Sequence, residues 1–404
     1  WSLSGSAEYY KRDELTLGDR DFTRCPTDNY LDGSDYIDPL TGVSKCFSLN
    51  SGGVTINTIG TSYMAGVAAD GTTATSFNRW RPNSAVTTGL VGFEGVGGSG
   101  TNTSVRDTYD PDMLNESLIS PVEVATVYLQ GAYDLQALGN AEVYGEFLYN
   151  QRTSSQTSYS QLVLDYAVGS PLIPDNLSSS VFSAYDQGLN LGQAVGVRAF
   201  IGYGNKTSTQ QVDFTKTVGG IRGDFTPLNG WRYDVSGSYT RSDASYTSEQ
   251  FLIDRLQNSL DVVANGDGTF SCAGGADGCV AAPALNSQTL AGEFPTDWLG
   301  YVLTDVTGTT VYDEAVLSAS IDGPLFSLPA GEVRAFIGTE YREMSIDDTP
   351  GIDMQTANIY NYSTAAITRG DDSVWEVFGE VEVPLVRDVR FAKNLTLSAS
   401  GRYT

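Results

Sequence analysis

"WRYDVSGSYTRSD" (Trp231–Asp243) separates into two different sets of side chains when it is read two residues at a time. One set is apolar or aromatic, and the other carries charges and hydroxyls. Successive side chains of a β-strand point to opposite faces, so this period of two predicts a strand whose faces meet different surroundings. The apolar set is Trp231, Tyr233, Val235, Gly237 and Tyr239; the polar set is Arg232, Asp234, Ser236, Ser238, Thr240 and Ser242.

The same alternation returns along the chain, for example in "NAEVYGEFLYNQR" (140–152), "EAVLSASID" (314–322) and "EVRAFIGTEYR" (332–342). The composition agrees, because 44 glycines and 23 tyrosines against 4 methionines suit strands and tight turns better than long helices. We therefore expect an all-β protein. The predicted strands lie near residues 2–11, 122–134, 140–152, 209–223, 230–242, 311–322, 331–344, 373–384 and 394–404.

The connections between these strands alternate between short and long. In an up-and-down sheet, alternate connections emerge at opposite ends, so one end would carry tight turns and the other all the large loops. This predicts a transmembrane antiparallel up-and-down β-barrel with long extracellular loops and short periplasmic turns, and it places residues 1–404 in one barrel domain. The short connections lie near 135–139, 224–229, 323–330 and 385–393, and the long ones near 12–121, 153–208, 243–310 and 345–372.

The two strand faces have different expected environments. The polar face is too charged for a dry core, because buried unpaired charges cost several kcal/mol each. We expect it to line a wet interior while the apolar face meets lipid. Trp231 and Tyr239 are eight residues apart on the apolar face. At about 3.3 Å per residue and about 40° of tilt they span about 20 Å, close to the apolar band of outer-membrane barrels.

Charge and the absence of histidine narrow the function. A formal net charge of −26 would repel a phosphate backbone, so we expect no nucleic-acid partner. The chain has no histidine, the usual ligand of zinc, copper and haem and the usual general base. We therefore expect no enzymatic activity, no metal and no cofactor. The sequence has no run of about 18 apolar residues, the pattern of a membrane-spanning helix.

The two ends of the sequence also carry an expectation. Trp1 opens directly on a strand-like segment without a signal sequence, and the chain stops within the predicted strand "NLTLSASGRYT" (394–404). A sheet edge left there would invite unwanted pairing. We expect the sequence to be an internal part of a longer protein.

Three local features depart from the main pattern. "AVGVRAFIGYG" (194–204) reads as β, but a full crossing there would break the alternation of connections, so we expect a loop hairpin or an extracellular extension of the next strand. The pair Gly219-Gly220 suggests a β-bulge. "TSEQFLIDRLQNSLDVV" (247–263) predicts a short loop helix with Thr247 or Ser248 as its N-cap. Its helically spaced apolar residues are Leu252, Leu256, Leu260 and Val263.

Three short motifs favour ordinary loops over ligand sites. "GVGGSG" (95–100) fits a dinucleotide-binding pattern, but no βαβ unit surrounds it. "NGDGTF" (265–270) and "DDTPGID" (347–353) offer oxygens that suit calcium, but neither matches an EF-hand loop. We interpret the first as a flexible loop and the other two as solvated turns.

A charged surface is predicted on the polar face. Glu376, Glu380 and Glu382 share a strand face, and paired carboxylates at a suitable separation can cleave glycosidic bonds. The same geometry arises in any charged barrel wall. We favour a cross-strand ionic lattice, or a docking surface for an internal domain, over catalysis. The residues expected to face the lumen are Arg232, Asp234, Glu332, Arg334, Glu340, Glu376, Glu380 and Glu382, with Arg342 on the same side.

The four cysteines form two local pairs, Cys25 with Cys46 and Cys272 with Cys279. Three disulfide pairings are possible, and the sequence does not choose between them. Pairing within each local pair closes two loops and is the most economical arrangement. It would imply an oxidising, extracytoplasmic compartment. The alternative is four free thiols.

Several stretches closely resemble the middle of the barrel in TonB-dependent outer-membrane receptors of the long-loop proteobacterial branch. They are "GIRGDFTPLNGWRYDVSGSYTRSD", "CAGGADGCVAAPALN", "SASIDGPLFSLPAGEVRAFIGTEYRE", "SVWEVFGEVEVPLV" and "LTLSASGRYT". The resemblance is good over residues 209–404 and thinner over 1–208.

The resemblance implies a 22-stranded barrel, of which about nine or ten strands are present, around an N-terminal plug domain. The plug carries a short box that the energy-transducing protein TonB pulls on from the periplasm. We expect the plug and the C-terminal strands to lie outside this sequence. The implied partners are the TonB complex, reached through the plug, outer-membrane lipid and lipopolysaccharide, and a small or medium-sized solute. The implied location is the bacterial outer membrane.

The expected function is active import of a scarce solute, such as a ferric siderophore, cobalamin or an oligosaccharide. The alternatives are a passive porin and a secreted β-rich glycan-binding protein or enzyme; a structural outer-membrane protein is a weaker third. Candidate ligand-binding residues lie at the expected extracellular ends of strands and in loops. They are Trp80, Arg152, Arg241, Tyr301, Arg342 and Tyr360.

Overall fold

A computed structural model describes residues 1–20, 55–58, 64–67, 73–77, 79–82, 87, 93–95, 111–174, 195–290 and 292–404. In this part of the chain, nine long strands form one continuous antiparallel path, in the order in which they occur along the chain. They are β1 (Ser2–Arg12), β9 (Val122–Asp134), β10 (Glu142–Ala167), β11 (Val195–Asp224), β12 (Arg232–Phe251), β15 (Leu303–Leu328), β16 (Gly331–Thr349), β17 (Thr368–Val389) and β18 (Ala392–Tyr403).

Shorter elements lie in the long connections. Three short strands extend the main sheet beside β11: β3 (Thr55–Thr58), β6 (Arg79–Pro82) and β7 (Phe93–Gly95). Three two-stranded sheets pair β2 (Leu15–Thr16) with β8 (Ser117–Ile119), β4 (Met64–Val67) with β5 (Thr73–Phe77), and β13 (Val262–Ala264) with β14 (Phe270–Cys272). The helices are η1 (Leu17–Asp19), η3 (Pro111–Asn115), α1 (Ile253–Leu260), α2 (Ser287–Leu290), α3 (Thr296–Val302) and α4 (Ile352–Gln355).

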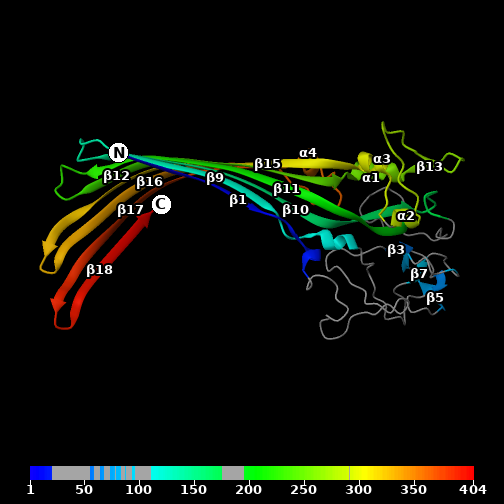
Figure 1. Cartoon of the computed structure of the whole chain (residues 1–404), viewed down its shortest axis with the longest axis horizontal. Helices are drawn as coiled ribbons and strands as arrows, with labels where there is room; N and C mark the ends of the chain where they lie inside the picture. Colours follow the sequence, from blue (N-terminus) through cyan, green and yellow to red (C-terminus); the bar gives the residue numbers. More distant parts are fainter. Residues whose placement is uncertain are drawn as a thin grey trace.

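The alternation of short and long connections is present in the structure. The sheet is a long, bent wall with tight turns at one end, and the helices and small sheets gather at the other (Figure 1). Strands are found at all nine predicted positions, but β10, β11, β12 and β15 run well past the predicted ranges into segments that the pattern assigned to loops. At the described residues, no helix is long and apolar enough to cross a membrane.

Residue pairing keeps the two faces separate across the whole sheet. Even-numbered residues pair with even-numbered ones from strand to strand over most of the sheet, as in Glu142 with Arg222 and Arg222 with Asp234. Odd-numbered residues likewise share the opposite face, as in Val235 with Ala319. The polar set of the opening segment therefore continues as one even-numbered face, and the apolar set continues as one odd-numbered face.

Both outer strands of this path have an unpaired edge. Within the described residues, β1 pairs only with β9, and β18 pairs only with β17. The described strands thus form an open sheet, and the predicted closure into a barrel does not occur among them. Exposed strand edges present unpaired backbone N–H and C=O groups, which favour the addition of further strands.

The predicted bulge at Gly219-Gly220 is wrong. Both glycines lie in regular pairing, Gly219 with Gly145 and Gly220 with Tyr144. The irregularities of β11 fall near its beginning, opposite Ser160/Gln161 and Tyr166/Ala167. The glycine serves a different purpose. A Cβ built on Gly220 would lie 2.4 Å from Cζ of Tyr144, so the missing side chain makes room for that ring.

Replacing Gly220 with alanine is expected to destabilise the sheet by about 1–3 kcal/mol, in the range of overpacking substitutions. The new methyl group would displace the Tyr144 ring and its 2.8 Å hydrogen bond to the Asp234 carboxylate. Gly219→Ala is the matched control, because a Cβ there meets nothing within 4 Å. Chemical denaturation should show a lower midpoint for Gly220→Ala alone, and Tyr144→Ala should remove most of that difference. Equal effects at the two glycines would contradict this explanation.

The loop helix is present but begins later than predicted. Helix α1 has Leu252 as its N-cap, while Thr247 and Ser248 lie inside β12, paired with Thr307 and Val306 of β15. The Thr247 and Thr307 hydroxyls bond at 2.8 Å, so strand pairing competes successfully with helix capping. Of the segment predicted at 194–204, the described residues 195–204 are the beginning of β11, which agrees with one of the two predicted alternatives, an extension of the next strand.

Candidate functional site

A line of tyrosines crosses the odd-numbered face and divides it into two regions. We call this the tyrosine line; its members are Tyr9 of β1, Tyr149 of β10, Tyr239 of β12 and Tyr341 of β16. Toward the tight turns, the exposed residues of this face include Val143, Phe147, Val235, Leu317 and Ile337. Toward the loops, the same face carries Asp213, Arg241, Asp243, Asp313 and Glu343. The line therefore marks a boundary between an apolar band and a charged zone.

The tyrosine line is inclined to the strands by a constant amount. Tyr9 is connected by six successive strand pairings to Asp347 of β16. Tyr341 lies six residues before Asp347, so the line shifts by one residue for each strand. Tyr149 and Tyr239 fall on the line with the same stagger of one residue per strand. A shift of one residue is about 3.3 Å along the strand, and neighbouring strands are about 4.8 Å apart. The strands are therefore tilted by about 35° from the perpendicular to the tyrosine line. Strands of membrane barrels tilt by roughly 35–45°.

Hydrogen bonds anchor two members of the line to the charged zone. The Tyr149 hydroxyl donates to the Asp213 carboxylate at 2.7 Å, and the Tyr239 hydroxyl donates to Asp313. Arg241 bridges Asp313 and Asp243, with nitrogen–oxygen distances of 3.1 and 3.4 Å. The ring bodies thus lie against the apolar band while their polar tips face charged groups, as aromatic residues do at an interface between an apolar and an aqueous phase.

Part of the predicted ionic lattice forms on the even-numbered face. Three ion pairs join neighbouring strands and one lies within β16, and they leave the acidic side chains Glu332, Glu380 and Glu382 without an ion pair among the described residues. The pairs are Arg222 with Glu142 (2.8 Å from Nε), Arg334 with Asp322 (3.1 Å), Arg402 with Glu376 (3.4 Å) and Arg342 with Glu340 (2.6 Å). Arg232 and Asp234 share this face, on β12.

The loop end of the sheet contains an apolar core, which we call the loop core. It joins the extensions of β10 and β11 to β12, to the three helices α1, α2 and α3 and to the segments beside them. Its aromatic centre packs Phe294 against Trp298 at 5.0 Å between ring centroids, and Tyr203 against Phe251 at 5.1 Å. The buried members are Leu162, Leu164, Tyr166, Leu172, Ile173, Val197, Ala199, Ile201, Phe251, Leu256, Leu260, Ala282, Leu285, Leu290, Phe294, Trp298 and Val302.

A buried ion pair ties the two strand extensions together beside the loop core. Arg198 of β11 binds Asp165 of β10 through both ends of its guanidinium, at 2.6 Å from Nε and 2.5 Å from Nη2. The Asp165 side chain is 3% exposed and that of Arg198 is 11% exposed. The Tyr360 hydroxyl lies nearby and accepts a 3.2 Å bond from the Val163 amide, and burial raises the pKa of this phenol.

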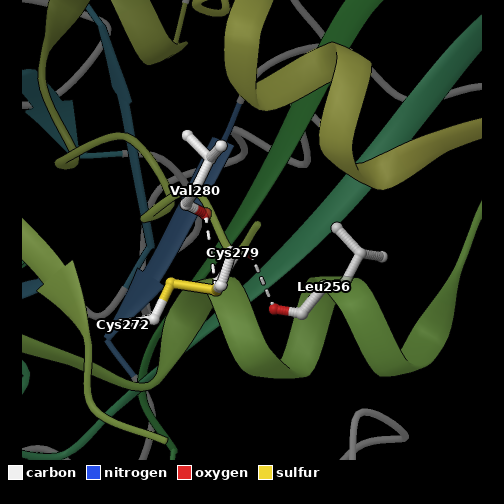
Figure 2. Close-up of a disulfide and its surroundings, with 5 residues drawn as sticks. Leu256, Cys272, Cys279 and Val280 are labelled. Atoms are coloured by element: carbon white, nitrogen blue, oxygen red, sulfur yellow. Dashed lines mark hydrogen bonds between the residues drawn. A yellow bond between two sulfur atoms is a disulfide. The ribbon is translucent and has the colours of Figure 1, made fainter. Parts of the chain in front are cut away.

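The predicted Cys272–Cys279 disulfide is confirmed, with a sequence separation of seven residues. It lies beside helix α1, close to Leu256 of the loop core (Figure 2). The Ala273 amide also donates to the Asp261 carbonyl at the end of α1, so the disulfide loop is fixed to the helix. Cys25 and Cys46 lie outside the described residues.

A polar pocket of about 280 Å³ opens on the even-numbered face, where the sheet meets the loop core. We call it the serine pocket. Strand pairing places Ser158 opposite Lys206 and Ser208 opposite Ser248, so three strands supply its floor. Helix α4 and the segment after it close one side. Its lining residues are Ser158, Ser160, Lys206, Thr207, Ser208, Thr209, Gln210, Tyr246, Thr247, Ser248, Glu249, Gln250, Met354 and Tyr362.

Lys206 is the one basic residue among those that line the serine pocket. Its Nζ lies 5.4 Å from the centroid of the Tyr203 ring and 5.3 Å from that of Phe251, a cation–π arrangement with two members of the aromatic centre. Burial lowers the pKa of this ammonium group, and the Glu249 carboxylate opposes the shift. No ion pair within 4 Å joins Lys206 to an acid among the described residues.

The predicted ligand-binding residues do not form one site. Tyr301 and Tyr360 both pack against the loop core, and Arg255 lies 5.7 Å from the centroid of the Tyr301 ring. Arg241 lies on the odd-numbered face in the charged zone beyond the tyrosine line. Arg342 and the exposed Arg152 lie on the even-numbered face. Trp80 is in β6, with its side chain outside the description.

The serine pocket was not predicted from the sequence. The sequence contains one sign of it: the pocket residues of the even-numbered face occupy every second position in "NKTSTQ" (205–210) and "YTSEQ" (246–250), as residues on one face of a strand do. Their convergence depends on the pairing of β10, β11 and β12 beyond the predicted strand ends, and the alternation does not specify that register.

An apolar hollow and an acidic turn are less suited than the serine pocket to bind a ligand. A hollow of about 710 Å³ lies against the odd-numbered face and is lined mainly by apolar side chains such as Ile221, Tyr233 and Ile337, without converging charges. In the turn at 265–270, Asp267 accepts bonds from the Thr269 hydroxyl and amide, and these bonds lower the pKa of its carboxyl. The Asp267 carboxylate therefore has its hydrogen-bond partners within the turn itself.

No protein-family model and no curated protein matches the chain. The features of this chain that bear on its function are the two-faced sheet, the tyrosine line and the serine pocket.

Proposed function

We propose that the chain forms part of the wall of an outer-membrane β-barrel that imports a scarce solute in a TonB-dependent manner. The tyrosine line carries this proposal. It separates an exposed apolar band from a charged zone on one face, and its stagger of one residue per strand gives the tilt typical of membrane barrels. A water-exposed face would have no reason to change from apolar to charged along such a line.

The even-numbered face supports a filled lumen. Ion pairs join four arginines of this face, Arg222, Arg334, Arg342 and Arg402, to acidic neighbours. Toward the turn end, Glu332, Glu380 and Glu382 have no ion pair among the described residues. An internal plug domain with complementary basic groups would satisfy them. In this proposal the plug lies in the lumen and contacts the TonB complex, and further strands pair with the free edges of β1 and β18.

The loop end supports solute capture. The loop core packs the described parts of the connections after β10 and after β12 against the strand extensions, and the Cys272–Cys279 disulfide closes a loop within the second of these connections. The serine pocket opens on the face assigned to the lumen. A solute that enters from the loop end would meet this pocket before it reached the charged wall.

The proposal is tested with the native protein, in the cells that produce it and after purification from them. We expect it to fractionate with the outer membrane, to need detergent for extraction, and to leave sugar-loaded liposomes sealed after reconstitution. Solute uptake by intact cells should stop when the proton gradient is dissipated. Leaky liposomes would favour the passive porin, and extraction without detergent would favour the secreted glycan-binding protein or enzyme; either result would refute the proposal.

A further inference from the structure

We propose that the serine pocket binds a small, hydroxyl-rich solute that carries a carboxylate, with the Lys206 ammonium group facing the carboxylate. The inference rests on the proposed function only in taking this solute as the imported one. The binding itself follows from the side chains that the sheet register brings together.

The charge of the ligand follows from Lys206. Glu249 is the one acidic residue among those that line the pocket, but the Lys206 Nζ lies over the Tyr203 and Phe251 rings and makes no ion pair with it within 4 Å. The ammonium group therefore remains available to an anion. An anion that approaches a protein with a net charge of −26 is repelled at long range, and a local cation is needed to offset that repulsion. A half-buried ammonium group also binds a carboxylate more strongly than an exposed one, because the surroundings screen it less.

The hydroxyl-rich nature of the ligand follows from the pocket floor. Serine hydroxyls both donate and accept hydrogen bonds, and side-chain amides offer both functions on separate atoms. A polyol needs this mixture, since each of its own hydroxyls does both. The pocket supplies such groups from all three strands: Ser158, Ser160, Ser208, Gln210, Ser248 and Gln250.

A fixed aromatic wall favours a ring-shaped ligand. The ring of Tyr246 lies directly over Gly308, where an added Cβ would come within 2.3 Å of it, and the Tyr246 hydroxyl lies 3.7 Å from the Met354 sulfur. These contacts hold the ring at the pocket wall, and Tyr362 lies among the same lining residues. The volume of about 280 Å³ is near the lower end for small-molecule pockets and suits a single acidic sugar ring.

Calorimetric titration of the full chain in detergent with glucuronate and with glucose tests the proposal, because these sugars differ mainly in one carboxylate. We expect glucuronate to bind at least about tenfold more tightly than glucose. Lys206→Gln should weaken glucuronate binding by about tenfold or more and leave glucose binding unchanged, and Lys206→Arg should retain most of the affinity. Lys216→Gln is the matched control, since Lys216 lies on the same face of β11 but outside the pocket.

Three results would overturn the proposal: no glucuronate binding at about 10 mM, equal affinity for the two sugars, or equal losses from Lys206→Gln and Lys216→Gln. A purely structural role for Lys206 would appear as faster hydrogen exchange in the loop core with unchanged glucuronate binding, and this also contradicts it. Failure here leaves the liposome and fractionation results intact. Binding of glucuronate by a protein extracted without detergent would instead refute the import function alone.

Discussion

Replacing Asp165 with alanine is expected to destabilise the loop core by about 3–5 kcal/mol, the usual cost of breaking a buried ion pair. The Asp165 carboxylate accepts both guanidinium bonds from Arg198, and both side chains are largely withdrawn from solvent. Its removal leaves the guanidinium charge in a poorly solvated place between two strand extensions. Amides of Leu162–Tyr166 and Val197–Ile201 should then exchange with deuterium more than about a hundredfold faster.

A second ion pair provides the control for this result. Asp347 binds Arg369 at 2.9 Å, but their side chains are 48% and 61% exposed. Asp347→Ala should cost less than about 1 kcal/mol, as exposed pairs usually do. The double substitution Asp165→Leu with Arg198→Met should recover much of the lost protection, because it removes both charges together. Similar effects at Asp165 and Asp347 would show that burial does not determine the strength of the pair.

The strands of this protein could be predicted because their signal is local. Alternation in segments such as Trp231–Asp243 depends on neighbouring residues alone, so strands were found at every predicted position. Strand ends were predicted less well. Beyond Arg152 the sequence of β10 becomes rich in serine and threonine on both faces, so the contrast between faces disappears although the backbone pairing continues to Ala167.

Features that depend on register could not be predicted. Gly220 reads as a bulge in one strand, and only its pairing with Tyr144 explains why a side chain is missing there. The tyrosine line also cannot be recognised in the sequence, because Tyr9 and Tyr341 lie far apart in the chain and are connected only through six strand pairings. The serine pocket has the same origin.

If the odd-numbered face meets lipid, as proposed, replacing Val235 with arginine is expected to destabilise the protein in a bilayer by about 2–4 kcal/mol, the cost of a basic residue on a lipid face near the bilayer midplane. Val235 lies on the odd-numbered face, 40% exposed and four residues from Tyr239 of the tyrosine line. Trp231, whose Nε1 donates to the Pro324 carbonyl at 3.0 Å, lies four residues away in the other direction. Val235 is therefore near the middle of the apolar band, and its direct partners on the neighbouring strands, Ile221 and Ala319, are apolar.

Ser238→Arg is the matched control, because it adds the same side chain three residues away on the even-numbered face. Ser238 pairs directly with Val218 and Val316, and the next strands outward place Glu146 and Arg342 in the same register. An arginine there would lie on the face that carries the ion pairs, two strands away from the Glu146 carboxylate. Equilibrium unfolding in lipid bilayers should show the loss for Val235→Arg and a change below about 1 kcal/mol for Ser238→Arg. If the odd-numbered face instead met water, Val235→Arg would be an ordinary surface substitution worth less than about 0.5 kcal/mol. That outcome would exclude lipid as the partner of this face, and the import proposal would fail with it.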